Sequence, residues 1–315
     1  MSKILITAIG GDIGYGVIKA IKQSGRDMYI IGCDTQRFNY SYDLVEEFYL
    51  APSYKNEKDW LEFILDILKK NEIEYFWPIT EKEIQIVNEN IDLFLTCKVS
   101  INLKHVLDVA LDKKNTAICL SESGVNTPKV WEKIEEYNRD YPVVVKERFS
   151  CGSHGVVIAN NKMEMITSYA NMDNPVIQEY IGSSDEEYTM TIFSDGIITN
   201  SVVFKRTLGF GGMSRYVELI HDSKTDEIAK IIAKYLGLKG SINVQMRKKE
   251  CEYYIFEINP RISSTIGFRV AIGFNDVAWW LDMLDKKQVT RYETPNNNIY
   301  GVRGVEEKVF IDRES

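Results

Sequence analysis

Apolar stretches that favour β-strands alternate with amphipathic stretches that favour α-helices along the first third of this chain. Residues 4–7 and 29–34 are short runs rich in β-branched side chains, and residues 75–78 are a third apolar run that we expect to form a strand. Residues 60–70, in contrast, carry leucine and isoleucine three and four positions apart, which is the spacing of one helix face. Strands separated by helices form βαβ units and therefore a parallel sheet. We expect residues 1–110 to form an open α/β domain.

The pattern changes in the rest of the chain, where apolar runs follow one another through short turns. Strands are predicted at residues 142–146, 156–159, 176–181, 188–193, 197–203, 241–246 and 253–258. Strands joined in this way pair antiparallel, and the helix predicted at 226–236 can pack on their sheet. We therefore expect an α+β second part. No linker rich in proline or glycine separates the two parts.

The composition excludes several classes of site. The three histidines lie far apart and the five cysteines show no C-x-x-C spacing, so a multi-histidine or zinc-cluster site is not expected. Such thiols are typical of a reduced, cytoplasmic protein. The net charge of −8 argues against a nucleic-acid partner, because the phosphate backbone requires a basic face. No apolar segment is long enough to span a membrane. Any bound metal must therefore be held mainly by oxygen.

The first candidate site is the glycine turn after the first strand. A dinucleotide fingerprint would place its three glycines at Ile9, Gly11 and Gly14, so the first glycine is missing. Asp34 ends the second strand, where a ribose-binding acid would lie. Two interpretations stay open. The turn can cradle a phosphate or a dinucleotide at a helix N-terminus, or it can be a tight turn that simply needs glycine.

The second candidate is Lys146 with the loop that follows it. Lys146 ends an apolar strand, and residues 150–155 contain two glycines and several backbone N–H groups. A fixed cation beside a ring of N–H donors suits a triphosphate. The alternative is a lysine at a strand end, followed by a hairpin tip.

The third candidate is the strand that ends at Arg261. Side chains alternate across a strand, so Glu257 and Asn259 point to the same face. Gln245, on the preceding strand, can lie across the sheet from Glu257. Oxygen ligands in this arrangement suit Mg²⁺ bound to phosphate, and Arg261 can stabilise a transferring phosphoryl group. The alternative is the solvent-facing side of a sheet, which the neighbouring apolar residues disfavour.

The fourth candidate is the segment from residue 176 to residue 188. Glu179 follows an apolar strand, and the backbone near Ile181 lies beside apolar side chains. This combination can recognise the edge of an adenine ring, and Glu187 can hold ribose hydroxyls. Taken alone, the segment is only an acidic loop between strands.

In their order and spacing, these segments resemble those of the ATP-grasp superfamily. The likeness is to the ATP-binding units of carbamoyl-phosphate synthase large subunit and biotin carboxylase, and to stand-alone carboxylate–amine ligases. It spans about residues 110–275 and is carried by residues 112–113, 124–128, 141–146, 150–155, 178–181, 187–188, 245 and 256–261.

The resemblance implies a domain plan. Residues 1–110 would be a Rossmann-like pre-ATP-grasp domain, and residues 111–315 a two-subdomain ATP-grasp fold. Within that fold, the subdomain that closes on the nucleotide would cover about 115–185. The metal and substrate subdomain would cover about 186–315.

The resemblance also implies a role for each matching residue. Those that would bind ATP are Lys113, Lys146, Ser150, Gly152, Ser153, Gly155, Glu179, Tyr180, Ile181 and Glu187. Those that would hold one or two Mg²⁺ ions, or Mn²⁺ in their place, are Gln245, Glu257 and Asn259. Arg261 and Lys146 would be catalytic. Candidates for substrate contacts are Arg269, Glu81, Gly11 and Ser214, with Lys205, Arg206 and Arg215 as further cations in plausible segments.

The activity that the resemblance implies is ADP-forming ligation of a small-molecule carboxylate to an amine through an acyl phosphate. Such a reaction requires positioning and charge neutralisation rather than a histidine relay. Carbamoyl phosphate synthesis is not expected, because the chain is far shorter than a full large subunit. Two alternatives stay open: an NAD(P)-dependent oxidoreductase that uses the first domain, and a non-catalytic nucleotide-binding module. A homodimer also stays open.

Overall fold

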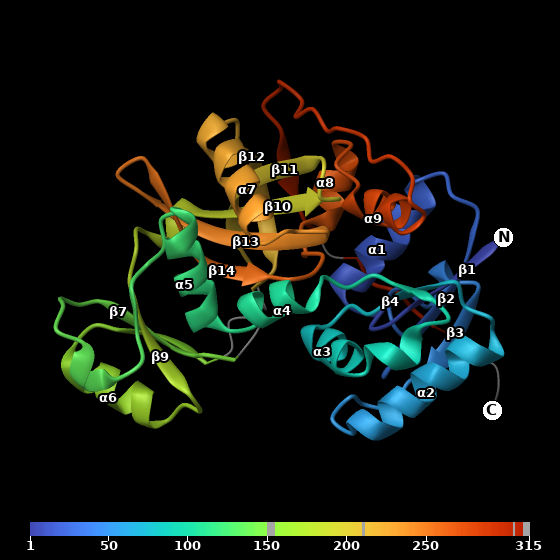
Figure 1. The fold of residues 1–315 in the computed structure, drawn as a ribbon, viewed down its shortest axis with the longest axis horizontal. Coiled ribbons are helices and arrows are strands. Elements are labelled where there is room, and N and C mark those ends of the chain that lie inside the picture. Colours follow the sequence, from blue (N-terminus) through green and yellow to red (C-terminus); the bar gives the residue numbers. More distant parts are fainter. Residues whose placement is uncertain (150–154, 210–211, 305, 311–315) are drawn as a thin grey trace. The chain divides into compact units, whose positions relative to one another are not determined.

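The computed structural model describes four stretches of the chain: residues 1–149, 155–209, 212–304 and 306–310 (Figure 1). They divide into two compact units. The first unit is formed by Met1–Asn102, Arg261–Tyr292 and the segment that begins at Arg303. The second unit is formed by Leu103–Pro260 and Glu293–Val302. Among the described residues, no helix has the length and apolar character needed to cross a membrane.

The first unit is built on a parallel sheet of five strands in the order β3-β2-β1-β4-β5. The strands are β1 (Ser2–Ile6), β2 (Met28–Asp34), β3 (Glu47–Leu50), β4 (Tyr75–Trp77) and β5 (Lys98–Val99). The helices are α1 (Asp12–Gln23), α2 (Glu57–Lys70), α3 (Glu81–Glu89), α8 (Ile266–Ala271) and α9 (Asp276–Leu284), with 3₁₀ turns η1 (Tyr42–Leu44) and η2 (Ile91–Phe94). The parallel sheet expected from the alternating pattern is present.

Alternation along the strands directs side chains to helices on both faces of this sheet. Phe76 of β4 belongs to a buried cluster with Trp60 and Ile64 of α2. Its neighbour Trp77 points the other way and meets Trp280 of α9, with ring centroids 5.5 Å apart. The sheet is therefore covered on both sides, as a parallel sheet requires.

Helices α8 and α9 pack on α1, although they come from the far end of the chain. Gly16 makes this contact close, because a Cβ atom there would lie 2.1 Å from Cγ2 of Ile266. Asn275 adds a hydrogen bond to the carbonyl oxygen of Ala20 at 3.0 Å. The compact units thus differ from the predicted boundaries, which assigned residues 261–292 to the ATP-grasp part. The sequence does not show this difference, because it depends on long-range packing.

Asp285, at the C-terminal end of α9, anchors that helix to the sheet. Its carboxylate accepts hydrogen bonds from Lys98 at 2.8 Å, Tyr75 at 2.5 Å and Arg26 at 3.0 Å. Burial alone would raise the pKa of Asp285, but these three donors hold it well below its usual range. The ionised form is therefore the one that the fold stabilises.

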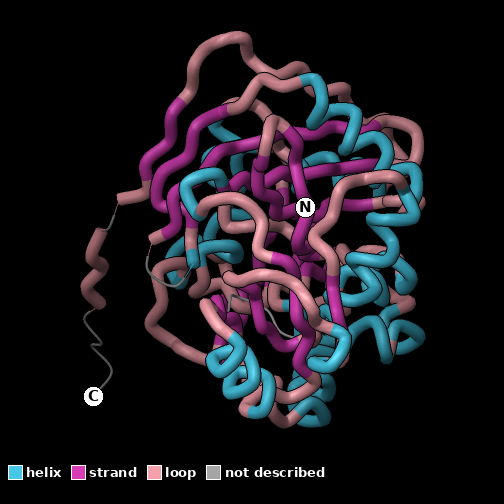
Figure 2. The backbone as a smooth tube through the Cα atoms, turned by 90° about the vertical axis from the view of Figure 1, so that its left-hand side faces the viewer, coloured by secondary structure: helices cyan, strands magenta, loops and turns pink. Residues whose placement is uncertain are grey.

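The second unit contains an antiparallel sheet of six strands, the large sheet, in the order β14-β13-β10-β11-β12-β15. Its strands are β10 (Glu187–Ser194), β11 (Thr199–Leu208), β12 (Ser214–Leu219), β13 (Gly240–Lys249), β14 (Glu252–Asn259) and β15 (Tyr300–Val302). Helices α4 (Lys104–Ala110), α5 (Lys113–Ser123) and α7 (Ser223–Tyr235) pack on it. Figure 2 shows the strands in magenta and the helices in cyan.

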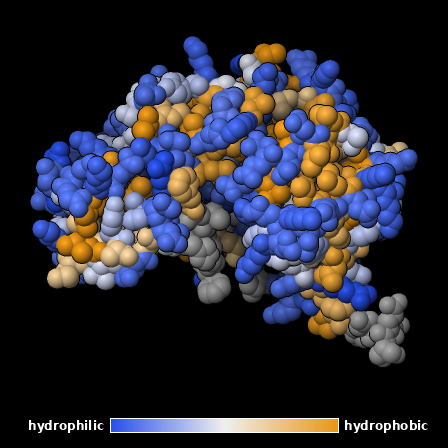
Figure 3. Space-filling model, turned by 60° about the horizontal axis from the view of Figure 1, so that its bottom comes forward, coloured by the Kyte–Doolittle hydropathy of each residue, from blue (hydrophilic) through white to orange (hydrophobic). Residues whose placement is uncertain are grey.

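A smaller antiparallel sheet of four strands, the small sheet, completes the second unit in the order β6-β9-β7-β8. Its elements are β6 (Val130–Trp131), β7 (Val143–Glu147), β8 (Val156–Ala159), β9 (Pro175–Glu179), α6 (Lys162–Ala170), and the 3₁₀ turns η3 (Ile134–Glu136) and η4 (Ser184–Glu186). Residues 156–158 of the edge strand β8 are exposed although all three are apolar. Apolar side chains are visible among hydrophilic ones on this part of the surface, at the left of Figure 3.

All the strands predicted from apolar runs are present, and five further strands are not predicted. These are β3, β5, β6, β12 and β15. Four of the five lie at a sheet edge and have two to four residues. So short a strand contains too little alternation to be recognised by pattern.

We predict that Asp285→Asn lowers the midpoint of thermal unfolding by at least about 3 °C, because it removes a charge that three donors satisfy. Differential scanning calorimetry measures the shift. Asp66→Asn, at an exposed position of α2, is the matched control and should change the midpoint little. Since the native pKa of Asp285 is lowered, its contribution to stability is present at neutral pH and is lost as the pH falls below about 4. Equal midpoints for the two variants would contradict this role.

Candidate functional site

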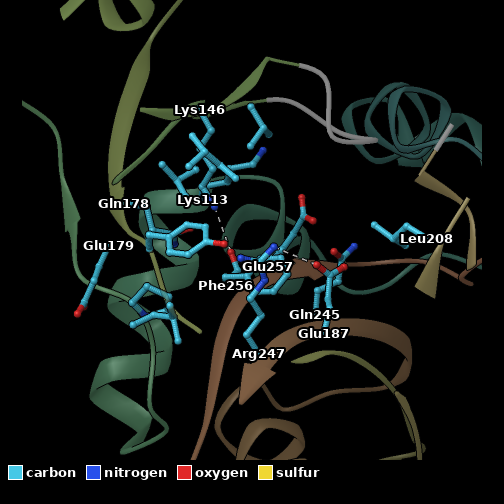
Figure 4. Close-up of a pocket in the computed structure, with 16 residues that line it drawn as sticks. Lys113, Lys146, Gln178, Glu179, Glu187, Leu208, Gln245, Arg247, Phe256 and Glu257 are labelled. Carbon is cyan, nitrogen blue, oxygen red and sulfur yellow. Dashed lines mark hydrogen bonds and ion pairs between the residues drawn. The ribbon is translucent and has the colours of Figure 1, made fainter. Parts of the chain in front are cut away.

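A pocket in the second unit lies between the small sheet and the large sheet (Figure 4). Its volume of about 190 Å³ is more than ten times the ~15 Å³ that one water molecule needs, so it suits a small organic ligand. The residues that line it are Lys113, Pro128, Val144, Lys146, Val156, Ile158, Gln178, Glu179, Tyr180, Ile181, Glu187, Leu208, Gln245, Arg247, Phe256 and Glu257. The pocket thus brings together eight of the residues predicted from sequence.

Two lysines enter this pocket from different elements and both are buried. Lys113 is the first residue of α5, whose N-cap is Asp112. The carboxylate of Asp112 also accepts two hydrogen bonds from Arg148, at 2.7 and 2.6 Å, which ties the start of α5 to the end of β7. Lys146 lies on β7 and donates to the carbonyl oxygen of Phe256 at 3.2 Å. Two like charges are therefore held in one buried place.

The electrostatics of Lys146 reflect this arrangement. Burial lowers its pKa to about 7, repulsion from Lys113 acts in the same direction, and the charge of Glu257 opposes them. A buried cation without a full counter-charge destabilises the fold. An anion bound between the lysines would remove that cost.

A β-bulge in β14 shapes the floor of the pocket. Gln245 of β13 pairs with Glu257, but the next residue, Met246, pairs with Ile255. Phe256 is therefore the extra residue of the bulge. Strict alternation would place Phe256 and Glu257 on opposite faces, yet both line the pocket. The expected pairing of Gln245 with Glu257 across the sheet is present.

Glu187 and Gln245 are held by arginines. Arg206 of β11 donates to Oε1 of Glu187 at 2.7 and 3.2 Å and to Oε1 of Gln245 at 2.9 Å. Arg247 of β13 donates to Oε2 of Glu187 at 3.2 Å. Both carboxylate oxygens of Glu187 therefore have a cationic partner.

The wall predicted to contact adenine is formed by the end of β9 and the residues after it. Tyr180 and Ile181 line the pocket, and the Arg247 guanidinium lies 5.3 Å from the ring centre of Tyr180. The carboxylate of Glu179 accepts a hydrogen bond from the backbone N–H of Lys129 at 3.2 Å. In Figure 4 it points away from Lys113 and Lys146. Recognition of a base at this wall would therefore use backbone groups rather than the Glu179 side chain.

Other predicted residues of the second unit lie outside this lining. Asn259 is buried two positions beyond Glu257. Ser214 is also buried, at the start of β12. Gly155 is exposed and has a φ of +66°, which glycine adopts without strain. Ser150, Gly152 and Ser153 lie outside the described residues.

Three further residues predicted from the sequence, Arg261, Glu81 and Gly11, belong to the first unit. Arg261 and Glu81 form an ion pair at 2.9 Å, so they are partners rather than two separate sites. Gly11 is the N-cap of α1. Within the same turn, Oδ2 of Asp34 accepts the N–H of Gly10 at 2.8 Å. Because this hydrogen bond closes the turn, it favours the interpretation of a structural glycine turn over a ribose site.

The prediction that Arg269 binds a substrate acid is wrong. Its side chain is fully buried and is paired with Asp276 by two hydrogen bonds of 3.0 Å. Its remaining terminal nitrogen donates to Ser263 and Thr265. The sequence shows an arginine after a glycine-containing segment but not the aspartate that neutralises it.

Sequence reasoning missed Arg247 and misplaced Arg206. Arg206 appears in the sequence only as one of several cations for a substrate acid, and the structure places it against Glu187 and Gln245. Arg247 lies two positions after Gln245 on one strand. The same alternation rule that predicts Glu257 with Asn259 would have placed it on the face of Gln245.

Comparisons with known proteins bear on this pocket. Residues 110–265 match the family model described as ATP-grasp domain. The carbamoyl phosphate synthase large chain of Methanocorpusculum labreanum is 24% identical over 314 residues, covering 84% of this chain. This chain spans only 28% of that relative's length.

Solved structures share the fold. The biotin carboxylase domain of Hydrogenobacter thermophilus 2-oxoglutarate carboxylase, a dimer in complex with MgADP, ADP and bicarbonate, has a TM-score of 0.74 at 17% identity. The match covers 95% of this chain and 73% of that one. The L-amino acid ligase of Bacillus licheniformis has a TM-score of 0.72 at 14% identity, covering 90% and 74%. At such identities the likeness shows the fold alone.

We predict that Lys146→Met raises the unfolding midpoint of the ligand-free protein and abolishes the rise that ATP causes in the wild type. The reason is that methionine removes the buried charge together with its anion contact. The native pKa of about 7 lies below the ordinary value of 10.5. Between pH 7 and pH 10.5, Lys146 is therefore protonated in the unfolded chain but largely neutral in the native protein. The destabilisation that Lys146 causes decreases as the pH rises through that range.

Thermal shift assays at pH 6.5 and pH 9.5 measure both effects, and the advantage of Lys146→Met should shrink at the higher pH. Lys230→Met, at an exposed position of α7, is the control and should behave as the wild type does. A Lys146→Met protein that is still stabilised by ATP would overturn the assignment.

Proposed function

We propose that this chain, whose residues 110–265 match the family model of an ATP-grasp domain, is an ATP-dependent ligase that joins a small-molecule carboxylate to an amine, releasing ADP and phosphate. The observation that carries the proposal is the pocket in which Lys113 and Lys146 are buried opposite Glu257. Two buried lysines and a carboxylate in one enclosed place suit a phosphate chain with its metal ion.

Parts of ATP are proposed to lie at the two ends of the pocket. Lys113 and Lys146 would neutralise the phosphates. Gly155, Ser150, Gly152 and Ser153 stay proposed ATP-binding residues from the sequence. Tyr180 and Ile181 would receive adenine through backbone groups. Arg206 and Arg247 already donate hydrogen bonds to Glu187. Glu187 would therefore accept hydrogen bonds from ribose hydroxyls only through the oxygen lone pairs that remain free.

The donor set suits Mg²⁺. Glu257 lines the pocket and no described residue donates a hydrogen bond to it, so its oxygens are available for a hard cation. Asn259, two positions further along β14, is the second proposed ligand. Gln245, the third predicted ligand, faces Glu257 across the sheet, but its amide oxygen already accepts a hydrogen bond from Arg206. A magnesium ion bound there would neutralise phosphate charge and polarise the transferred group.

In the proposed reaction, a carboxylate oxygen attacks the γ-phosphorus of ATP, and the bond from that phosphorus to the bridging oxygen breaks to give ADP. The amine then attacks the carbonyl carbon of the acyl phosphate and loses a proton, and inorganic phosphate leaves. Lys146 would offset the charge that develops on the γ-phosphate. Arg261, held by Glu81, is proposed to stabilise the acyl phosphate.

For the first unit we infer a Rossmann-like pre-ATP-grasp domain. Its strand order β3-β2-β1-β4-β5 follows the start of the order found in doubly wound folds. The oxidoreductase alternative is disfavoured because Asp34 is committed to the glycine turn. The carboxyl edge of this sheet, with Gly11 and Glu81, remains the proposed place for the substrate.

We predict that the protein releases ADP only when Mg²⁺, a carboxylate and an amine are all present. A coupled assay for ADP, run over a panel of carboxylates and amines, measures this. Glu257→Gln should reduce the rate by about a hundredfold or more, because it removes the charge that holds the metal. Glu227→Gln, at an exposed position of α7, should keep full activity. Formation of AMP in place of ADP would exclude the proposed mechanism.

A further inference from the structure

Arg206 is a buried cation that contacts two residues of the pocket lining, Glu187 and Gln245. Its side chain is only 6% exposed, and it projects from β11, near the middle of the large sheet. One guanidinium nitrogen donates both to Glu187 at 2.7 Å and to Gln245 at 2.9 Å. A buried charge with two fixed partners cannot turn away without leaving both of them unsatisfied.

This contact changes which oxygens can bind a divalent cation. Glu187 has Arg206 on one carboxylate oxygen and Arg247 on the other. The amide oxygen of Gln245 receives a hydrogen bond from a full positive charge. A divalent ion at that oxygen would lie close to the guanidinium, and repulsion at such a distance is large in a buried site. Of the acidic side chains that line the described pocket, only Glu257 faces Lys113 and Lys146 and has no guanidinium as a partner.

Glu257, with the amide oxygen of Asn259, phosphate oxygens and water, is a sufficient set for one Mg²⁺ ion. A second ion about 4 Å from the first would need further oxygen ligands. The neighbouring oxygens of Glu187 and Gln245 already face a guanidinium. The positive charge that a second ion would supply is present as Arg206.

We propose that Arg206 takes the place of a second divalent cation, so that this chain binds one metal ion per nucleotide, held by Glu257 with Asn259. The inference rests on the proposed function, since it concerns the same nucleotide pocket. It adds the number of metal ions and the residue that sets this number.

The experiment counts metal ions rather than turnover. The full chain is titrated with Mn²⁺ in the presence of the non-hydrolysable ATP analogue adenylyl imidodiphosphate. Free Mn²⁺ is measured by electron paramagnetic resonance, and bound nucleotide by equilibrium dialysis. The wild type should bind one Mn²⁺ per nucleotide. Arg206→Met should bind two, because Gln245 and Glu187 regain free oxygens, whereas Arg206→Lys should still bind one.

Arg139→Met, at an exposed position of the second unit, is the matched control and should bind one ion. Circular dichroism checks that each variant folds. If Arg206→Met does not fold, Arg206→Gln, which keeps a donor for Glu187, replaces it with the same expectation of two ions.

The outcomes separate the two proposals. Two ions per nucleotide in the wild type would refute the inference while leaving the proposed function intact. One ion in both the wild type and the folded Arg206→Met or Arg206→Gln variant would refute the role of Arg206. Failure of the wild type to bind the nucleotide at all would refute the proposed function together with the inference.

Discussion

The hydrogen bond from Lys146 to the carbonyl oxygen of Phe256 joins the small sheet to the large sheet of the second unit. It depends on the bulge in β14, because Phe256 is the residue that the bulge leaves without a partner in the ladder. The same bulge turns Phe256 and Glu257 towards one pocket. A single backbone irregularity thus supplies an apolar wall, a carboxylate and the anchor of a buried lysine.

Charges elsewhere in the molecule are mostly used for structure. In the first unit, Arg269 with Asp276 is a fully buried pair, and Asp285 gathers three donors around the end of α9. Such groups are neutralised inside the fold and leave little for a ligand. Lys146 differs because burial and repulsion from Lys113 lower its pKa in a pocket, and this separates a binding site from a structural ion pair.

The elements with several apolar positions were predictable from the sequence, as was the position of Gln245 across the sheet from Glu257. Lys146 was predicted in the same site only through the family resemblance. Strand alternation and hairpin pairing act over a few residues, so local patterns encode them. The edge strands β5, β6 and β15 have two or three residues and leave no such pattern. The role of Arg269 was mispredicted because its partner Asp276 is set by the packing of α8 and α9 rather than by spacing along a strand.

The sequence by itself determined the order of strands and helices, the oxygen-rich character of the site and the cations near it. Only the tertiary structure decided which carboxylate each cation meets. Arg206 is 19 positions from Glu187 and 39 from Gln245, and their contact requires the register of β11, β10 and β13 to align all three. Register is a cooperative property of the whole sheet. No local pattern in the sequence encodes register. Only the folded chain therefore shows that Glu257 has no arginine partner among the described residues and is available to bind a metal ion.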